Sequence, residues 1–160
     1  MKKITIKTEL DSYESLIEMT QEEQWLMQKA KEACEKAYAP YSKFKVGAAL
    51  LLENGKIILG NNQENAAYPS GMCAERVAIW KAHSDYPDVK MLKMALTIKS
   101  EKQVIDSPVP PCGACRQSIA EYEVKQKTPI EIFFMGEKGA IYKTKSLANL
   151  LPLVFDKEVL

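Results

Sequence analysis

Three cysteines are the residues of this 160-residue chain best suited to chemistry. Cys73 stands in PSGMCAERVAIW, and Cys112 and Cys115 form a C-x-x-C pair in PPCGACRQ. Four cysteines in all are sparse for a secreted disulfide framework, and they suit metal binding or redox chemistry in a reducing compartment. Cysteine thiolates are also ligands that zinc prefers. The thiols are therefore the first candidates for a functional site.

Each of these three cysteines stands where a helix is predicted to start. The apolar pattern turns helical from Met72 to about His83, and again from Cys112 to about Tyr122. A helix N-terminus carries about half a positive charge, which lowers the pKa of a thiol and favours the thiolate. Two such helix ends facing each other could hold a zinc ion. Three thiolates would leave the fourth tetrahedral position for water, which is typical of a catalytic site.

Two further residues could bind a metal, and we predict that neither does. Cys34 lies on the apolar face of the first predicted helix, where a small core residue is expected. His83 is the only histidine and lies toward the end of its helix, where it complements the helix dipole instead.

Glu75 and Arg76 follow Cys73 within the same helical turn. A carboxylate beside a zinc-bound water can take its proton and pass it to a substrate atom. A guanidinium can donate hydrogen bonds to thiolate sulfurs and offset the negative charge that raises the pKa of bound water. Each residue also has an ordinary explanation, since glutamate stabilises helix starts and arginine is common on surfaces. The three nearby thiols favour the chemical role of Glu75.

Helices and strands alternate in the elements that must position these groups. Thr20 and Glu23 have the spacing of a capping box and begin a helix that ends near Ala39-Pro40. Asn54-Gly55 is a turn signal between two apolar runs and predicts a hairpin. The remaining predicted elements are strands in MLKMALTIK and IEIFFM, a last antiparallel edge strand in AIYKTK, and a short helix in SLANLLPLVF. The pattern predicts an α/β domain with a mixed sheet of about five strands.

Length and composition predict one domain, over residues 20–160. The chain is 46% hydrophobic, enough for one core, and it contains no repeat or linker. Residues 1–19 are polar and irregular apart from a possible strand in KITIKT. We expect an N-terminal extension that either covers a sheet edge or lies loose.

The charge balance and the apolar runs exclude several classes of partner. Twenty-two basic residues nearly cancel 21 acidic ones, so no charge excess favours nucleic acid or an anionic membrane. No apolar run approaches the roughly 20 residues of a membrane span, and no apolar stretch follows the basic N-terminus. We expect a cytoplasmic protein with a small-molecule substrate.

The motif C-A-E, followed 39 positions later by P-C-G-A-C-R-Q, resembles the signature of zinc-dependent nucleoside deaminases in its three-cysteine form. PYSKFKVGAALL, NQENAAYPSGMCAERVAIW and LLPLVF extend the likeness to the small homotetrameric cytidine deaminases, from about Thr20 onward. The resemblance implies a three-layer fold with helices on both faces of the sheet. It also implies one zinc ion per chain, bound by Cys73, Cys112 and Cys115, and a homotetramer with shared active sites.

The same resemblance implies hydrolytic deamination of cytidine and deoxycytidine to uridine and deoxyuridine, in pyrimidine salvage. Zinc-bound hydroxide would attack C4 of cytosine. Glu75 would protonate the ring nitrogen and pass a proton to the departing amine, while the backbone N–H of Ala74 helps to hold the base. Arg76 would compensate the charge of the thiolates.

The substrate-binding residues are also implied by the resemblance. It places Asn62 and Glu64 on the ribose 3′-hydroxyl, Phe44 beside the base, and Phe155 as an aromatic that closes the pocket. Phe155 and Tyr68 are the candidates for reaching a neighbouring chain's pocket. From the residues alone, Asn62 and Glu64 could simply form a turn, and Phe44 could belong to the core.

Other functions stay open at this stage. A deaminase of another amino-substituted base, of the blasticidin or guanine type, would share the metal ligands and Glu75, whereas Asn62, Glu64 and Phe44 favour a nucleoside. A thioredoxin-like pair would need no third thiol, and a structural zinc module would need a fourth ligand. RNA editing is disfavoured because no basic aromatic stripe is present. The residues leave open the choice between cytidine and deoxycytidine, since both carry the 3′-hydroxyl.

Overall fold

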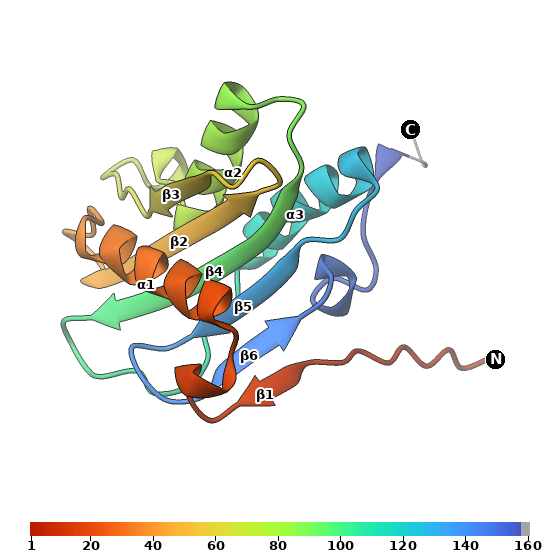
Figure 1. Ribbon diagram of the computed structural model, residues 1–160, viewed down its shortest axis with the longest axis horizontal. Coiled ribbons are helices and arrows are strands. Elements are labelled where there is room, and N and C mark those ends of the chain that lie inside the picture. Colours follow the sequence, from red (N-terminus) through yellow and green to blue (C-terminus); the bar gives the residue numbers. More distant parts are fainter. Residues whose placement is uncertain (158–160) are drawn as a thin grey trace.

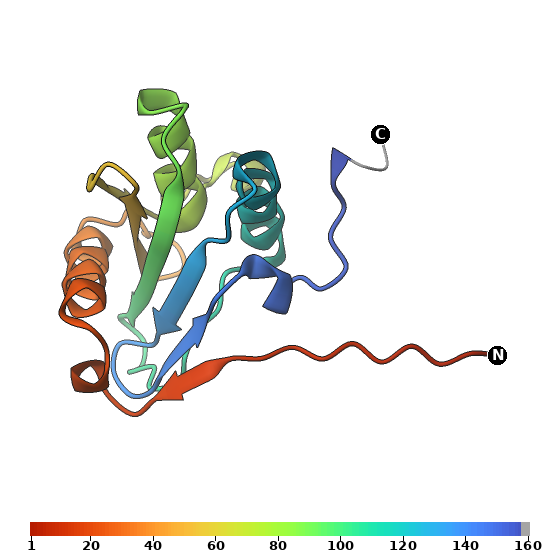
Figure 2. The same ribbon diagram turned by 45° about the vertical axis from the view of Figure 1, so that its right-hand side comes forward.

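A six-stranded sheet forms the middle layer of the computed structural model, which describes residues 1–157 (Figure 1). Helix α1 covers one face of this sheet, and helices α2 and α3 cover the other (Figure 2). The helices are α1 (Gln21–Glu35), α2 (Ala74–Asp85) and α3 (Gly113–Gln126). The strands are β1 (Asp11–Tyr13), β2 (Phe44–Leu52), β3 (Ile57–Asn61), β4 (Met91–Ser100), β5 (Glu131–Met135) and β6 (Ile141–Thr144). Three short 3₁₀ turns are η1 (Leu16–Glu18), η2 (Tyr68–Ser70) and η3 (Leu147–Asn149).

The sheet is mixed, as the sequence predicts. Its strand order is β1-β6-β5-β4-β2-β3, and every pair is antiparallel except β4 with β5. The sixth strand is β1, which pairs with the outer edge of β6. The predicted α/β fold with helices on both faces is therefore confirmed.

Two apolar layers hold the helices on the sheet, because successive strand residues point to opposite faces. On β5, Phe133 packs in the cluster beneath α1, and the next residue, Phe134, packs in the cluster beneath α2 and α3. Both rings are almost fully buried. The strand sequences thus read as continuous apolar runs, as expected for a sheet covered on both sides.

The start of α1 joins a capping box to a buried ion pair. The Thr20 hydroxyl accepts a hydrogen bond from the N–H of Glu23, and the Glu23 carboxylate accepts one from the N–H of Thr20 at 3.0 Å. The same carboxylate, only 3% exposed, lies 2.6 Å from Lys143 Nζ on β6. Lys143 also pairs with Glu131 at 2.8 Å. This network connects α1 to β5 and β6.

The strand directions explain why two helices begin at the same end of the sheet. Strands β3 and β4 are each antiparallel to β2, so they run parallel to each other. The connections that follow β3 and β4 therefore leave the sheet at the same end, and they lead into α2 and α3 respectively. The topology brings the N-termini of these two helices together, although they are far apart in the sequence.

Two glycines are required by their surroundings. Gly55 has a φ of +78° in the β2–β3 turn, which confirms the predicted hairpin. At Gly60 on β3, a Cβ atom would overlap the carbonyl oxygen of Ala74 and lie 2.6 Å from the backbone nitrogen of Ala78. The first turn of α2 can pack on β3 only because Gly60 has no side chain.

Three predictions about the chain ends were wrong in part. Residues 3–8 form no strand, because β1 starts only at Asp11, opposite Lys143, and β6 ends one residue beyond Lys143. Strand β6 is antiparallel to β5 but is not an edge strand, since β1 covers it. The predicted helix over residues 146–155 is reduced to the turn η3, because Pro152 and the residue before it cannot continue a helix.

Among residues 1–157, no helix has the length and apolar character needed to cross a membrane.

Candidate active site

The three cysteines of the two motifs meet at the adjoining starts of α2 and α3. Cys73 is the N-cap residue of α2, Cys112 is the N-cap residue of α3, and Cys115 lies in the first turn of α3. Their sulfur atoms all lie within 4.8 Å of one another, and the Cys73 and Cys112 sulfurs are 3.9 Å apart. Two thiolates bound to one tetrahedral zinc ion at 2.3 Å would be separated by about 3.8 Å. The donor set and its spacing therefore fit one zinc ion per chain.

Neither Cys34 nor His83 belongs to this cluster. Cys34 is buried on α1, and burial raises its pKa to about 11, as expected for a neutral core thiol. The His83 ring packs against Tyr122, with ring centroids 5.2 Å apart, and lies near Lys125. Within residues 1–157, the cluster thus offers three protein ligands and leaves the fourth position open.

The electrostatics of the cluster favour a thiolate at Cys73. A hydrogen bond from Cys115, together with smaller contributions from Arg76 and Cys112, lowers the pKa of Cys73 to about 5. Cys115 is buried, and both its hydrogen bond to Cys73 and its burial raise its pKa. Cys73 therefore forms its thiolate before Cys115 does. A metal ion would displace the remaining thiol protons when it binds.

Glu75 and Arg76 occupy the second and third positions of α2. Glu75 is 5% exposed, and burial raises the pKa of its carboxyl, with a further contribution from the charge of Cys73. A buried carboxyl with a raised pKa is suited to giving and taking a proton near neutral pH. The Arg76 guanidinium lies 3.6 Å from the Cys73 sulfur and 5.8 Å from the Trp80 ring centroid.

A cavity of about 370 Å³ opens beside Cys73, Cys112 and Glu75. Its walls come from β4, from the loop before α3, from the start of β2 with the loop before it, and from the segment that follows β3. The other lining residues are Ser42, Phe44, Val46, Asn62, Glu64, Tyr68, Leu96, Ile98, Val109 and Pro110. The lining thus combines apolar side chains with the Glu75 carboxyl, two thiols and the polar side chains of Asn62 and Glu64.

The Asn62 side chain is held by β2 at both ends of its amide. Its Oδ1 accepts a hydrogen bond from the N–H of Val46 at 2.7 Å, and its Nδ2 donates one to the carbonyl of Phe44 at 2.9 Å. One N–H of the amide remains for another partner. Asn62 therefore fixes the backbone that carries Phe44 as well as facing the cavity.

Glu64 is held by the loop that precedes β2. Its Oε2 accepts hydrogen bonds from the N–H groups of Tyr41 and Ser42, at 2.8 and 3.2 Å. The Ser42 side chain and these two N–H groups lower the pKa of the Glu64 carboxyl. With Oε2 occupied, Oε1 is the oxygen that can accept a bond from a ligand.

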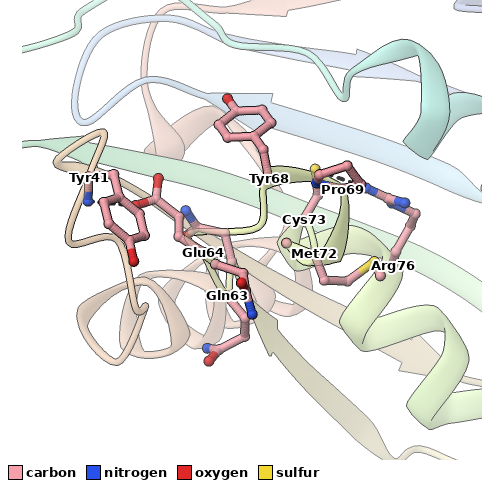
Figure 3. A pocket seen from close by; sticks show the side chains of 11 residues that line it. Tyr41, Gln63, Glu64, Tyr68, Pro69, Met72, Cys73 and Arg76 are labelled. Carbon is pink, nitrogen blue, oxygen red and sulfur yellow. Dashed lines mark hydrogen bonds between the residues drawn. The ribbon is translucent and has the colours of Figure 1, made fainter.

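A second cavity, of about 320 Å³, shares Asn62, Glu64, Tyr68 and Cys73 with the first. Figure 3 shows Tyr41 and Glu64 on one side of it and Arg76 beside Cys73 on the other. Tyr68 projects between the two groups and is 89% exposed. The segment from Asn62 to Cys73 therefore contributes to both cavities.

Comparison with known proteins identifies the family. The model of the cytidine and deoxycytidylate deaminase zinc-binding region matches residues 20–129. The chain belongs to this deaminase family. It is 47% identical over 133 residues to a cytidine deaminase of Sporosarcina psychrophila, covering 83% of this chain and 90% of the relative. It is 48% identical over 136 residues to a cytidine deaminase of Halalkalibacterium halodurans, covering 84% of this chain and 95% of the relative.

A solved deaminase structure agrees with the fold. The crystal structure of a cytidine deaminase from Burkholderia pseudomallei matches with a TM-score of 0.71 and 38% identity. The match covers 86% of this chain and all of that one. The α/β architecture described above is therefore the architecture of this deaminase.

Of the residues that the sequence assigns to the deaminase site, the structure brings these to one cavity: Phe44, Asn62, Glu64, Cys112, Cys73 and Glu75. Ala74 is buried at the first position of α2, between the last two of these residues. Phe155 is different, because it lines neither cavity and its side chain is 62% exposed.

Sequence reasoning missed six cavity residues, which are Ser42, Val46, Leu96, Ile98, Val109 and Pro110. Ser42 stands in PYSKF and Pro110 in SPVPPC, two positions before Phe44 and Cys112 respectively. Their proximity to Phe44 and Cys112 along the chain was the available signal. Serine and proline in a loop are otherwise read as turn formers.

Proposed function

We propose that this protein catalyses the hydrolytic deamination of cytidine and deoxycytidine, in which water replaces the C4 amino group and ammonia leaves. The proposal rests on the cavity of about 370 Å³, which is lined both by candidate catalytic residues and by candidate substrate-binding residues. Buried Glu75 and two thiols of the cluster, Cys73 and Cys112, line the same cavity as Phe44, Asn62 and Glu64. The similar relatives are themselves cytidine deaminases.

Cys73, Cys112 and Cys115 would hold zinc. When bound, zinc supplies a Lewis acid that lowers the pKa of a coordinated water to near neutrality. Arg76, 3.6 Å from the Cys73 sulfur, draws negative charge from that thiolate. This counteracts the loss of Lewis acidity that three thiolates would otherwise cause.

Glu75 moves the protons of the reaction. Its carboxyl takes a proton from water and delivers it to the ring nitrogen of the base. It then takes the remaining proton from the hydroxyl added at C4 and passes it to the departing amine, which leaves as ammonia. Burial supports this role, because it raises the pKa of Glu75 and so favours the protonated carboxyl more than water does. The backbone N–H of Ala74, at the start of α2, donates to the base.

Phe44, Asn62 and Glu64 position the nucleoside. The Phe44 ring packs against the base, Glu64 Oε1 accepts a hydrogen bond from the ribose 3′-hydroxyl, and the free N–H of Asn62 donates one to it. Cytidine and deoxycytidine both carry this hydroxyl, whereas free cytosine and blasticidin-type compounds do not present it in the same place.

The test is direct. Zinc is measured per chain, and the fall in ultraviolet absorbance is followed with cytidine, deoxycytidine, cytosine and blasticidin S. We expect about one zinc per chain and turnover of the two nucleosides. Turnover of blasticidin S in preference to cytidine would contradict the proposed substrate.

We further propose that the enzyme is a homotetramer with shared sites and acts in cytoplasmic pyrimidine salvage. Phe155 lines neither cavity of its own chain, and Tyr68 is largely exposed, so both are available to a neighbouring chain. Light scattering should give the mass of about four chains. A stable monomer with full activity would refute the shared site.

A further inference from the structure

Arg116 follows the C-x-x-C pair directly, and none of the roles described above uses it. Its guanidinium donates two hydrogen bonds to carbonyl oxygens from distant parts of the chain. Nε donates to Pro111 at 2.8 Å, and a terminal nitrogen donates to Leu150 at 2.8 Å. Pro111 precedes Cys112, and Leu150 ends the turn η3. One side chain therefore joins the loop that carries a thiol of the cluster to the C-terminal segment.

The loop before Cys112 needs such an external partner. Pro110 and Pro111 have no N–H group, so neither can fix the loop by donating a backbone hydrogen bond. The carbonyl of Pro111 belongs to the same peptide group as the nitrogen of Cys112. By holding this carbonyl, Arg116 sets the orientation of that peptide and with it the direction of the Cys112 side chain. Its planar guanidinium can hold two acceptors in a fixed geometry, which a lysine cannot do.

The C-terminal segment is docked on α3 at three points. Arg116 binds one end of η3, and Glu123 binds the other by accepting a hydrogen bond from the N–H of Leu147 at 2.8 Å. Gln117 donates to the carbonyl of Phe155 at 2.7 Å. Among these three side chains, Arg116 alone has a hydrogen bond to the loop before Cys112 in the described part of the chain.

We propose that Arg116 is a positioning residue for the metal centre, which holds the Pro111 carbonyl, orients Cys112 and so slows loss of the metal. This rests on the zinc site of the proposed function. Gln117 supplies a matched control, because it is the adjacent residue and holds the same segment without a hydrogen bond to the loop before Cys112 in residues 1–157.

The experiment measures the rate at which zinc-loaded proteins transfer zinc to an excess of a chromogenic chelator. Arg116→Ala should release zinc at least about tenfold faster than the unaltered protein, as is usual when a residue supporting a metal ligand is lost. Arg116→Lys should release zinc at a rate between that of Arg116→Ala and that of the unaltered protein, since an ammonium can reach one of the two carbonyls. Gln117→Ala should release zinc at the unaltered rate. At saturating zinc, Arg116→Ala should lower kcat for cytidine more than it changes KM.

The outcomes separate this proposal from the proposed function. If the unaltered protein holds zinc and both Arg116 variants release it at the unaltered rate, the role of Arg116 is refuted while the zinc site stands. Equal acceleration by Gln117→Ala would also refute it, since docking of the segment alone would then control the metal. If Arg116→Ala does not fold, the rate for Arg116→Lys decides between these results. An unaltered protein that binds no zinc would overturn both proposals.

Discussion

Asn62 and Glu64 hold the two ends of one short backbone segment, residues 41–46. Asn62 binds Phe44 and Val46, and Glu64 binds the N–H groups of Tyr41 and Ser42. The pair therefore fixes the rim of the cavity and faces it at the same time. Glu64 retains a whole carboxylate oxygen for a ligand, whereas Asn62 retains one N–H.

This difference makes Glu64 the sharper test of sugar recognition. Glu64→Ala should weaken transition-state binding of cytidine by about 1–3 kcal/mol, because an acceptor for the 3′-hydroxyl is lost and Asn62 is left without its companion. The measurement is kcat/KM for cytidine, with Glu101→Gln as a control at an exposed carboxylate. A Glu64→Ala enzyme that treats cytidine as the parent does would show that this carboxylate does not read the sugar.

The close contact between Gly60 and α2 predicts a contrast between two glycines. Gly60→Ala should lower the free energy of unfolding by about 1–3 kcal/mol, because the new methyl group overlaps the first turn of α2. Zinc content should fall with it, since that turn positions Cys73. Gly113→Ala is the matched control, because a Cβ there has no neighbour within 4 Å. Its effect should stay within about 0.5 kcal/mol.

Denaturant unfolding of both variants tests this account. Equal stability of the two would mean that the start of α2 moves away from β3 without cost, and the close packing of Gly60 would then have no role in holding the site.

The buried pair of Glu23 and Lys143 predicts a pH dependence of stability. Burial disfavours the Glu23 carboxylate, but hydrogen bonds from Lys143 and Thr20 outweigh this and lower its pKa below the ordinary 4.5. A lowered folded-state pKa contributes stability that is complete above the unfolded-state pKa and is lost as the pH falls through the folded-state pKa. Glu23→Gln should therefore lower the free energy of unfolding by about 2 kcal/mol at pH 7.

The difference between Glu23→Gln and the parent should shrink as the pH falls below 4.5. The partly exposed pair of Lys29 and Glu32 supplies the comparison, since Glu32→Gln should change stability by less than about 1 kcal/mol. Denaturant midpoints from pH 3 to pH 8 give the answer. A difference for Glu23→Gln that stays constant over this range would rule out the ionised pair as its source.

Much of the site could be predicted because its chemistry is local in the sequence. Cys73, Glu75 and Arg76 lie within one helical turn, and a helix start beside each cysteine motif could be read from the apolar pattern. The proximity of Cys73 and Cys112 could not be predicted from local patterns, because it depends on the sheet topology. Strands β3 and β4 run in the same direction, and this brings the two helix starts together.

The rest depends on partners that a sequence pattern does not display. Arg116 acts through the carbonyls of Pro111 and Leu150, and Ser42 acts through its bonds to Glu64. Backbone groups are the same at every residue, so residue types give no sign of such bonds. The strand β1 was missed for a related reason, because its place is decided by where β6 ends and not by the apolar pattern of residues 3–8.

We propose separate roles for Glu75, which moves protons, and for the three cysteines, which hold the metal. Cys112→Ala should lose zinc and activity together, because one of the three thiolate ligands is removed. Glu75→Gln should keep the metal, because its amide has nearly the same size as the carboxyl and no metal bond is lost. Its turnover should nevertheless fall by at least about 10²-fold, the usual contribution of general acid–base catalysis.

The decisive measurement is zinc content and cytidine turnover on one preparation of Glu75→Gln. We predict about one zinc per chain together with a loss of turnover. A Glu75→Gln protein that deaminates cytidine at the parent rate, or one that is inactive only because its zinc is gone, would contradict the assignment of Glu75 as the proton shuttle.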